Sequence, residues 1–69
     1  MKYSIYGRFE LLVERRENKW VVFHTADGKR VPATDIFIPD DLAEEEIADY
    51  FDVIFHEVAR PGDRITLLG

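Results

Sequence analysis

The chain has 69 residues and a formal net charge of −5, with 46% hydrophobic and 33% charged residues. This length suffices for one small domain with a modest core, so we expect residues 1–69 to form a single domain. The absence of cysteine excludes a disulfide framework and is typical of the reducing cytosol, so we expect a cytoplasmic protein. The N-terminal residues alternate apolar and polar side chains, which favours neither a signal peptide nor a membrane span.

Charge is distributed unevenly along the chain. Residues 1–30 carry a net charge of +3, whereas residues 31–69 carry −8. The overall acidity disfavours binding to nucleic acid or to an anionic membrane. The basic half nevertheless leaves one alternative open, a sheet that stacks bases on aromatic side chains. The residues for such a surface would be Tyr3, Tyr6, Arg8, Trp20 and Arg30.

Residues 2–16 alternate with a period of two, which predicts one long, half-buried strand. The apolar residues that share one face are Tyr3, Ile5, Phe9, Leu11 and Val13. Gly7 in the middle of this stretch indicates a bulge or the close approach of another backbone. Tyr6 and Leu12 are apolar exceptions on the opposite, otherwise polar face.

An asparagine-containing turn then predicts a tight hairpin and a second strand over residues 19–25. A two-residue turn would place Trp20 and Val22 on the inner face of the sheet. A shift of one residue would place Val21 and Phe23 there instead. The sequence leaves both registers open.

A second turn, at Asp27-Gly28, precedes a third strand within residues 29–38. Its best strand segment is 34–38. Pro32 cannot donate a backbone hydrogen bond, so this strand is expected at an edge of the sheet or is interrupted there. Residues 64–68 predict a short final strand.

The stretch from Ile38 to Pro61 predicts the single helix. Its apolar residues follow the i, i+3, i+4, i+7 spacing of one helical face, centred near Ile47 and Val58. They are Ala43, Ile47, Tyr50, Phe51, Ile54, Phe55 and Val58. Asp41 and Glu44 have the spacing of a capping box, which predicts the start of the helix.

The expected fold class is α+β with the element order β-β-β-α-β. We expect a mostly antiparallel four-stranded sheet in the spatial order 3-2-1-4, with one amphipathic helix packed on one face. The helix would return the chain so that the last strand runs parallel to the first, and a right-handed crossover would place it beside the first strand. No second helix is predicted to cover the other face.

No catalytic or metal-binding pattern is complete. The pair His56-Glu57 resembles half of a zinc-protease motif, but Arg60 occupies the position of the second histidine, and His24 has no partner ligands. The acidic run of the helix lacks EF-hand spacing, which predicts a solvated face or a contact for a basic partner. We therefore expect no enzyme, no cofactor, no metal site and no small-molecule substrate.

Apolar residues left on the outer face of the sheet favour a protein partner or a homodimer, because a contiguous apolar patch calls for a cover. Scattered surface residues of a monomer are the alternative interpretation. Pairing through the third or the fourth strand is another way to associate. The candidate partner-binding residues are Tyr6, Leu12, Val21, Phe23, Glu45, Asp49 and Asp52. We expect a small, non-enzymatic protein-interaction module, with a nucleic-acid-associated protein as the alternative.

The opening MKYSI and the strand NKWVVFH are similar to the first hairpin of HicB-type antitoxins. The expected order of elements also resembles their truncated RNase-H-like fold, which implies an antitoxin-like role by analogy. No DNA-binding ribbon-helix-helix or helix-turn-helix follows the last predicted strand, so the resemblance does not extend to DNA binding. With its YGRF start and FHEVARPGD helix exit, the whole chain also resembles small uncharacterised bacterial proteins, which implies a bacterial origin and no particular activity.

Overall fold

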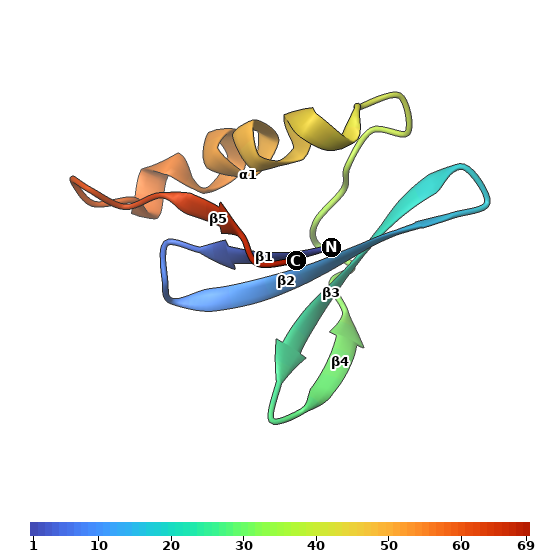
Figure 1. The fold of residues 1–69 in the computed structure, drawn as a ribbon, viewed down its shortest axis with the longest axis horizontal. Coiled ribbons are helices and arrows are strands. Elements are labelled where there is room, and N and C mark those ends of the chain that lie inside the picture. Colours follow the sequence, from blue (N-terminus) through green and yellow to red (C-terminus); the bar gives the residue numbers. More distant parts are fainter.

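A computed structural model describes all residues, 1–69. It shows a five-stranded antiparallel sheet with one helical segment across one face (Figure 1). The strands are β1 (Lys2–Ile5), β2 (Phe9–Arg16), β3 (Lys19–Ala26), β4 (Lys29–Pro32) and β5 (Ile65–Leu67). The helical segment consists of the 3₁₀ turn η1 (Glu44–Glu46), the helix α1 (Ile47–Phe55) and the 3₁₀ turn η2 (His56–Val58). The α+β class and the single helix are therefore confirmed.

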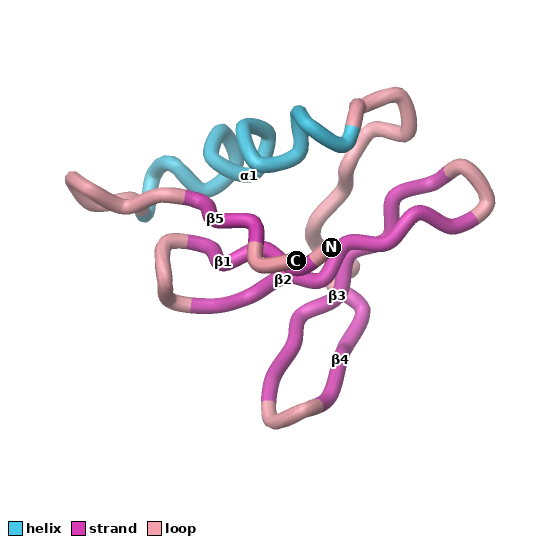
Figure 2. Tube along the Cα trace, viewed as in Figure 1, coloured by secondary structure: helices cyan, strands magenta, loops and turns pink.

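The prediction of one long strand over residues 2–16 is wrong. The chain turns at Tyr6 and Gly7, whose φ angles of 58° and 70° are left-handed, and the Arg8 N–H closes the turn by donating to the Ile5 carbonyl at 3.0 Å. β1 then folds back along β2, with Ile5 opposite Phe9 (Figure 2). Three residues form the loop between Ile5 and Phe9, so these two apolar residues are four positions apart. The apolar–polar alternation therefore keeps its period of two across the turn, and the sequence pattern does not reveal the turn.

β5 runs antiparallel to β1, with Ser4 opposite Thr66, so the predicted parallel arrangement is wrong. Because the predicted first strand is folded in two, its first half runs opposite to its second half. The chain returns from α1 alongside that first half. The sheet has five strands in the order β4-β3-β2-β1-β5 instead of the predicted four in the order 3-2-1-4, because the predicted first strand is the pair β1 and β2.

The two other hairpins follow the predicted turns. Glu17 and Asn18 have φ angles of 49° and 63°, the type I′ geometry that suits a two-residue hairpin. Val22 therefore lies opposite Val13, so Trp20 and Val22 are on the inner face and the register question is settled.

The predicted strand segment 34–38 does not form. β4 ends at the edge of the sheet with Pro32, and the Ala33 N–H donates once more to the Val22 carbonyl at 2.8 Å. The chain then leaves the sheet, and Ile38 enters the core, where its side chain is 1% exposed. Burial of Ile38 under the helical segment therefore replaces pairing of this stretch as a strand.

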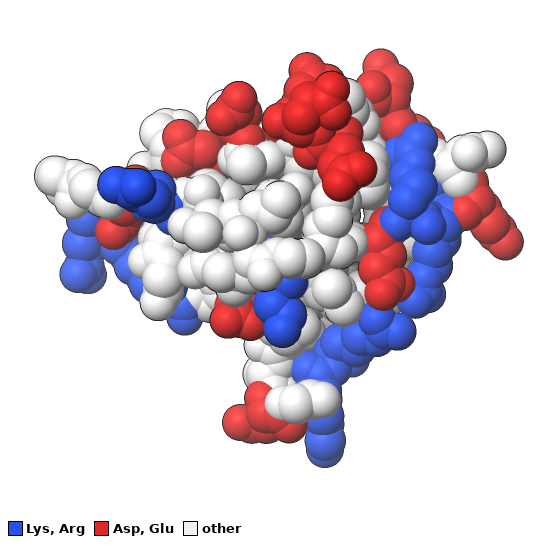
Figure 3. All heavy atoms as spheres, viewed as in Figure 1, with Lys and Arg blue, Asp and Glu red and all other residues white.

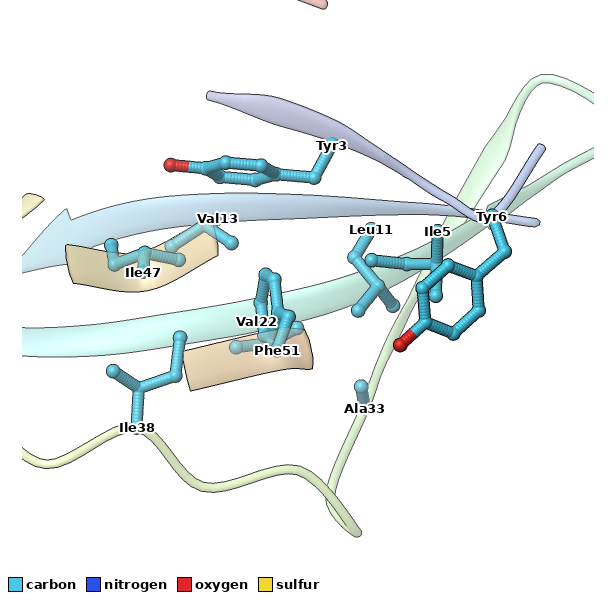
Figure 4. Packing of buried hydrophobic residues seen from close by; sticks show 10 residues of the cluster. All are labelled: Tyr3, Ile5, Tyr6, Leu11, Val13, Val22, Ala33, Ile38, Ile47 and Phe51. Atoms are coloured by element: carbon cyan, nitrogen blue, oxygen red, sulfur yellow. The ribbon is translucent and has the colours of Figure 1, made fainter. Parts of the chain in front are cut away.

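The core lies between α1 and the sheet face beneath it (Figure 4). Phe51 is fully buried and meets the ring of Tyr3 edge-on, with 5.5 Å between ring centroids. The buried cluster consists of Tyr3, Ile5, Tyr6, Leu11, Val13, Val22, Ala33, Ile38, Ile47 and Phe51. The helical face predicted around Ile47 and Phe51 is thus the one that holds the two layers together.

The helical segment begins later than predicted. The Glu46 carboxylate accepts a hydrogen bond from the Ala43 N–H at 3.0 Å, so it takes the position in the capping box that the sequence assigned to Glu44. The segment ends at Val58, because Ala59 is already extended. The helix expected from Ile38 to Pro61 is therefore real but too long at both ends.

Replacing Phe51 tests this packing. We expect Phe51→Ala to lower the free energy of unfolding by about 3–5 kcal/mol, since it leaves a cavity at the centre of the core. That is most of the stability of a small domain. Urea unfolding followed by circular dichroism measures the change. The control, Val53→Ala on the exposed side of α1, should change stability by less than about 0.5 kcal/mol. Equal effects of the two substitutions would contradict the packing.

Candidate interaction surfaces

The predicted partner-binding residues do not form one site. By location they are Leu12, Val21 and Phe23 on the outer sheet face, Glu45, Asp49 and Asp52 on the helical segment, and Tyr6 in the core. The sequence assigned these residues to the outer sheet face or to the acidic helix, and the structure keeps those two surfaces apart and places Tyr6 in neither.

The outer face of the sheet is covered by long charged side chains of the chain itself. Phe23 is only 8% exposed, although no second layer lies over it. The guanidinium groups of Arg16 and Arg30 lie over its ring, 5.4 Å and 5.0 Å from the centroid. The attraction between a guanidinium cation and an aromatic ring favours this placement of Arg16 and Arg30 over Phe23. The apolar patch predicted on this face is therefore largely shielded in the isolated chain.

Glu14 holds the two arginines in place. Its carboxylate accepts hydrogen bonds from both guanidinium groups, with 2.7 Å between Oε2 and Arg30 Nη1. The hydrogen bond from Arg30, followed by that from Arg16, keeps the pKa of Glu14 below its usual value against the opposing effect of burial. Glu14, Arg16 and Arg30 are called the Arg–Glu–Arg lid below.

Tyr6 was predicted on the outer face and lies instead under α1, because its left-handed backbone turns the side chain to the other side of the sheet. Its hydroxyl donates to Asp52 Oδ1 at 2.7 Å. Burial and this hydrogen bond raise the pKa of Tyr6 to about 12. The contact ties the β1–β2 turn to the middle of α1.

Arg8 fastens the same turn to the end of the helical segment. Its Nη1 donates to the Val58 carbonyl and its Nη2 to Asp63 Oδ2, both at 2.7 Å. These contacts engage Arg8 within the chain, and Tyr3 and Tyr6 are buried. Three of the five residues considered for base stacking are therefore committed to the fold.

A hollow of about 790 Å³ lies between the β2–β3 hairpin and residues 40–44. The Trp20 indole N–H donates to the Leu42 carbonyl at 2.9 Å, and the Arg15 guanidinium lies 4.5 Å from the indole centroid. Besides Arg15, the charged residues that line the hollow are Glu14, Arg16, Asp40, Asp41 and Glu44. Because opposite charges face one another, the hollow has no strong preference for an ion of either sign.

The helical stripe that the sequence predicted extends beyond the sheet. Ile54 and Val58 belong to this stripe, yet they are 41% and 55% exposed. Figure 1 shows the reason: α1 lies over β1 and β5, whereas the β3–β4 hairpin twists away from it. Strand twist of this kind cannot be read from the period of apolar residues.

Two residues on the inner face of the sheet are also uncovered. Phe9 and Val31 are exposed, and Phe9 connects the two layers, with its ring centroid 5.4 Å from that of Phe55 and 6.4 Å from that of His24. Val31 lies opposite His24 in the sheet. Phe9, Val31, Ile54 and Val58 are called the open apolar end below.

The two histidines lie apart from any metal-binding arrangement. His56 Nδ1 lies 2.7 Å from the Val53 carbonyl oxygen, and His24 Nε2 lies 3.8 Å from Asp35 Oδ1. No group of three or more His, Cys, Asp or Glu side chains is placed to hold a metal ion. No helix combines the length and the apolar character that a membrane crossing requires.

The fold and these surfaces define a small α+β domain in which one helical segment covers part of one face of an antiparallel sheet. The chain belongs to the DUF7661 family, a domain of unknown function whose family model matches residues 1–68. A search of curated proteins and a search of solved structures each found no match. The family match does not connect the chain with the HicB-type antitoxins that its first hairpin resembles.

The Arg–Glu–Arg lid predicts a response to acid. The pKa of Glu14 is lower in the folded than in the unfolded chain, so its stabilising effect is present above the unfolded pKa and is lost as pH falls through the folded one. We expect Glu14→Gln to destabilise the protein at neutral pH and this difference to shrink below about pH 4.5.

Urea unfolding of both proteins at several pH values between about 3 and 7 measures the difference. Glu57→Gln, which removes a carboxylate that forms no ion pair, is the matched control. A Glu14→Gln effect that is the same at every pH would contradict the lid.

Proposed function

We propose that this chain is a small, non-enzymatic protein-interaction module that binds through its open apolar end. The observation that supports the proposal is the continuation of the helical stripe past the sheet, which leaves Ile54 and Val58 uncovered. Contiguous apolar surface of this kind is typical of sites that a partner covers. Each Å² of it that a partner buries contributes roughly 25 cal/mol.

The surroundings of the open apolar end fit an interface. Arg8 and Asp63 form an ion pair beside Val58, with 2.7 Å between Nη2 and Oδ2. On the opposite side, His24 lies between Phe9 and Val31 and close to Asp35. An apolar centre with a polar rim is the usual anatomy of a protein–protein interface.

The simplest occupant is a second copy of the chain, because a two-fold interface needs only one self-complementary patch. A different protein is the other occupant, and the resemblance of the first hairpin to HicB-type antitoxins then favours a toxin-like partner. We place this role in the bacterial cytoplasm, in keeping with the absence of cysteine.

The nucleic-acid alternative has less support. Burial of Tyr3 and Tyr6 removes two stacking groups, and Glu14 neutralises Arg30. Titration with single-stranded RNA and DNA at low salt tests this alternative, since binding to phosphates should weaken steeply as salt is added.

A charge placed in the open apolar end tests the proposal. We expect the wild-type chain to show a mass that rises with concentration in sedimentation velocity, and Ile54→Asp to stay monomeric because a buried carboxylate without a partner is unfavourable. Val53→Asp is the matched control, since it places the same charge on the neighbouring residue of the same helix. Val53 is 66% exposed and lies outside the apolar stripe. Circular dichroism checks that both variants fold.

Two results would contradict association through this surface. One is equal behaviour of the two variants. The other is a wild-type chain that stays monomeric and that fails to co-purify with a toxin-like protein encoded beside it.

A further inference from the structure

The two edges of the sheet differ in their protection. β4 carries Lys29, Arg30 and Pro32, and lysine and proline are residues that keep an edge strand from pairing with other chains. β5 has the sequence Ile65-Thr66-Leu67, with neither charge nor proline, and Leu67 is 55% exposed. β5 is therefore the edge that is open to another strand.

The backbone of β5 is available on its outer side. The Arg64 carbonyl accepts from the Tyr6 N–H at 3.1 Å, and the Leu68 N–H donates to the Lys2 carbonyl at 2.7 Å. Because backbone groups alternate along a strand, those of Ile65 and Leu67 point away from β1. An antiparallel strand placed there could form two hydrogen bonds with each of these residues.

Two hollows lie along the helix-facing side of this edge. One, of about 380 Å³, adjoins Leu67 and is lined by Tyr3, Glu44, Glu45, Ala48 and Leu67. The other, of about 180 Å³, adjoins Ile65 and is lined by Ala48, Asp49, Asp52, Asp63, Arg64 and Ile65. The hollows thus repeat with the two-residue spacing at which side chains of an added strand would face α1.

Acidic groups line both hollows, with apolar surface beside Leu67 and with Arg64 as the one basic residue beside Ile65. Glu44, Glu45 and Asp49 form no ion pair within the chain. Figure 3 shows Asp and Glu gathered along the helical segment, with uncharged surface below them. A long basic side chain fits this arrangement, because its methylene groups can lie on Tyr3 and Leu67 while its charge reaches a carboxylate.

We propose that β5 binds an extended segment of a partner protein in which Arg or Lys alternates with apolar residues. The segment adds to the sheet as a sixth, antiparallel strand, which is a common mode of peptide recognition. Its basic residues face α1, and its apolar residues lie beside Thr66 and Leu68 on the other face. A second copy of β5 fits less well, because pairing two such edges would bring two acidic helical segments together.

This inference rests on the proposed function only in that the partner is a protein. It uses the β5 side of α1, whereas the open apolar end lies where the β3–β4 hairpin leaves the helix. Asp63 borders both surfaces, since it pairs with Arg8 beside Val58 and lines the hollow beside Ile65. The variants that test the two proposals leave Asp63 unchanged, so the proposals can succeed or fail separately.

Peptide titration tests the inference. The probe is a fluorescent peptide of about eight residues that alternates Arg and Val, and the first control has the same composition in a non-alternating order. We expect the alternating peptide to bind at least about tenfold more tightly, and to shift the NMR signals of residues 65–68 in the full chain. Equal binding of the two peptides would overturn the inference, since charge alone would then account for it.

Two further variants separate the strand from the charges. N-methylation of the peptide at the residues whose N–H groups point to β5 should abolish binding, whereas N-methylation at the alternate residues should not. Glu45→Gln together with Asp49→Asn should weaken binding at least about tenfold, and Ile54→Asp should leave it unchanged. Insensitivity to N-methylation would exclude strand addition, and loss of binding in Ile54→Asp would assign the peptide to the open apolar end.

Discussion

The left-handed turn at Tyr6 and Gly7 is the constraint on which the rest of the fold depends. Placing Tyr6 at a φ of 58° costs about 1–2 kcal/mol, and its burial and its hydrogen bond to Asp52 oppose that cost. The turn folds β1 back on β2, which exposes a free side of β1 to β5. It also brings Tyr6 and Arg8 against the middle and the end of the helical segment. The turn at Tyr6 and Gly7 therefore determines both the position of the helix and the existence of the β5 edge.

Much of the fold could be predicted from the sequence because local patterns decide it. Alternation identifies the inner face of β2, and the helical spacing identifies Ile47 and Phe51 as core residues. Asn18 and Gly28 mark hairpins that form, but the inner face of β3 depended on a register that the sequence left open. The turn at Tyr6 could not be predicted from the alternation, because a three-residue loop leaves Ile5 and Phe9 in the same period-two pattern. The error in the direction of β5 follows from it, since that direction depends on which half of the predicted strand β5 meets.

For the candidate surfaces too, local sequence patterns predict some features, whereas others depend on how the elements pack together. The period of two places Leu12 on the outer face, whereas Val21 and Phe23 lie there because of the register of the β2–β3 hairpin. Neither the period nor the register predicts that charged side chains cover these residues. Arg30 comes from β4, so its position over Phe23 depends on the register of the β3–β4 hairpin, and its ion pair with Glu14 also depends on that of the β2–β3 hairpin. The open apolar end depends on strand twist, and the hollows beside β5 depend on how α1 crosses β1. Such properties arise from contacts between elements, which no single segment of the sequence encodes.

Solution NMR of the wild-type chain tests the central turn most directly. Non-hydrogen-bonded residues in an antiparallel pair bring their α-carbons to about 4.5 Å, so their Hα protons give strong cross-strand contacts. We predict such contacts between Ser4 and Glu10 across β1 and β2, and between Tyr3 and Leu67 across β1 and β5. A strand that continues without a turn from Lys2 to Arg16 would show no contact between Ser4 and Glu10, and that result would contradict this account of the fold and of the β5 edge.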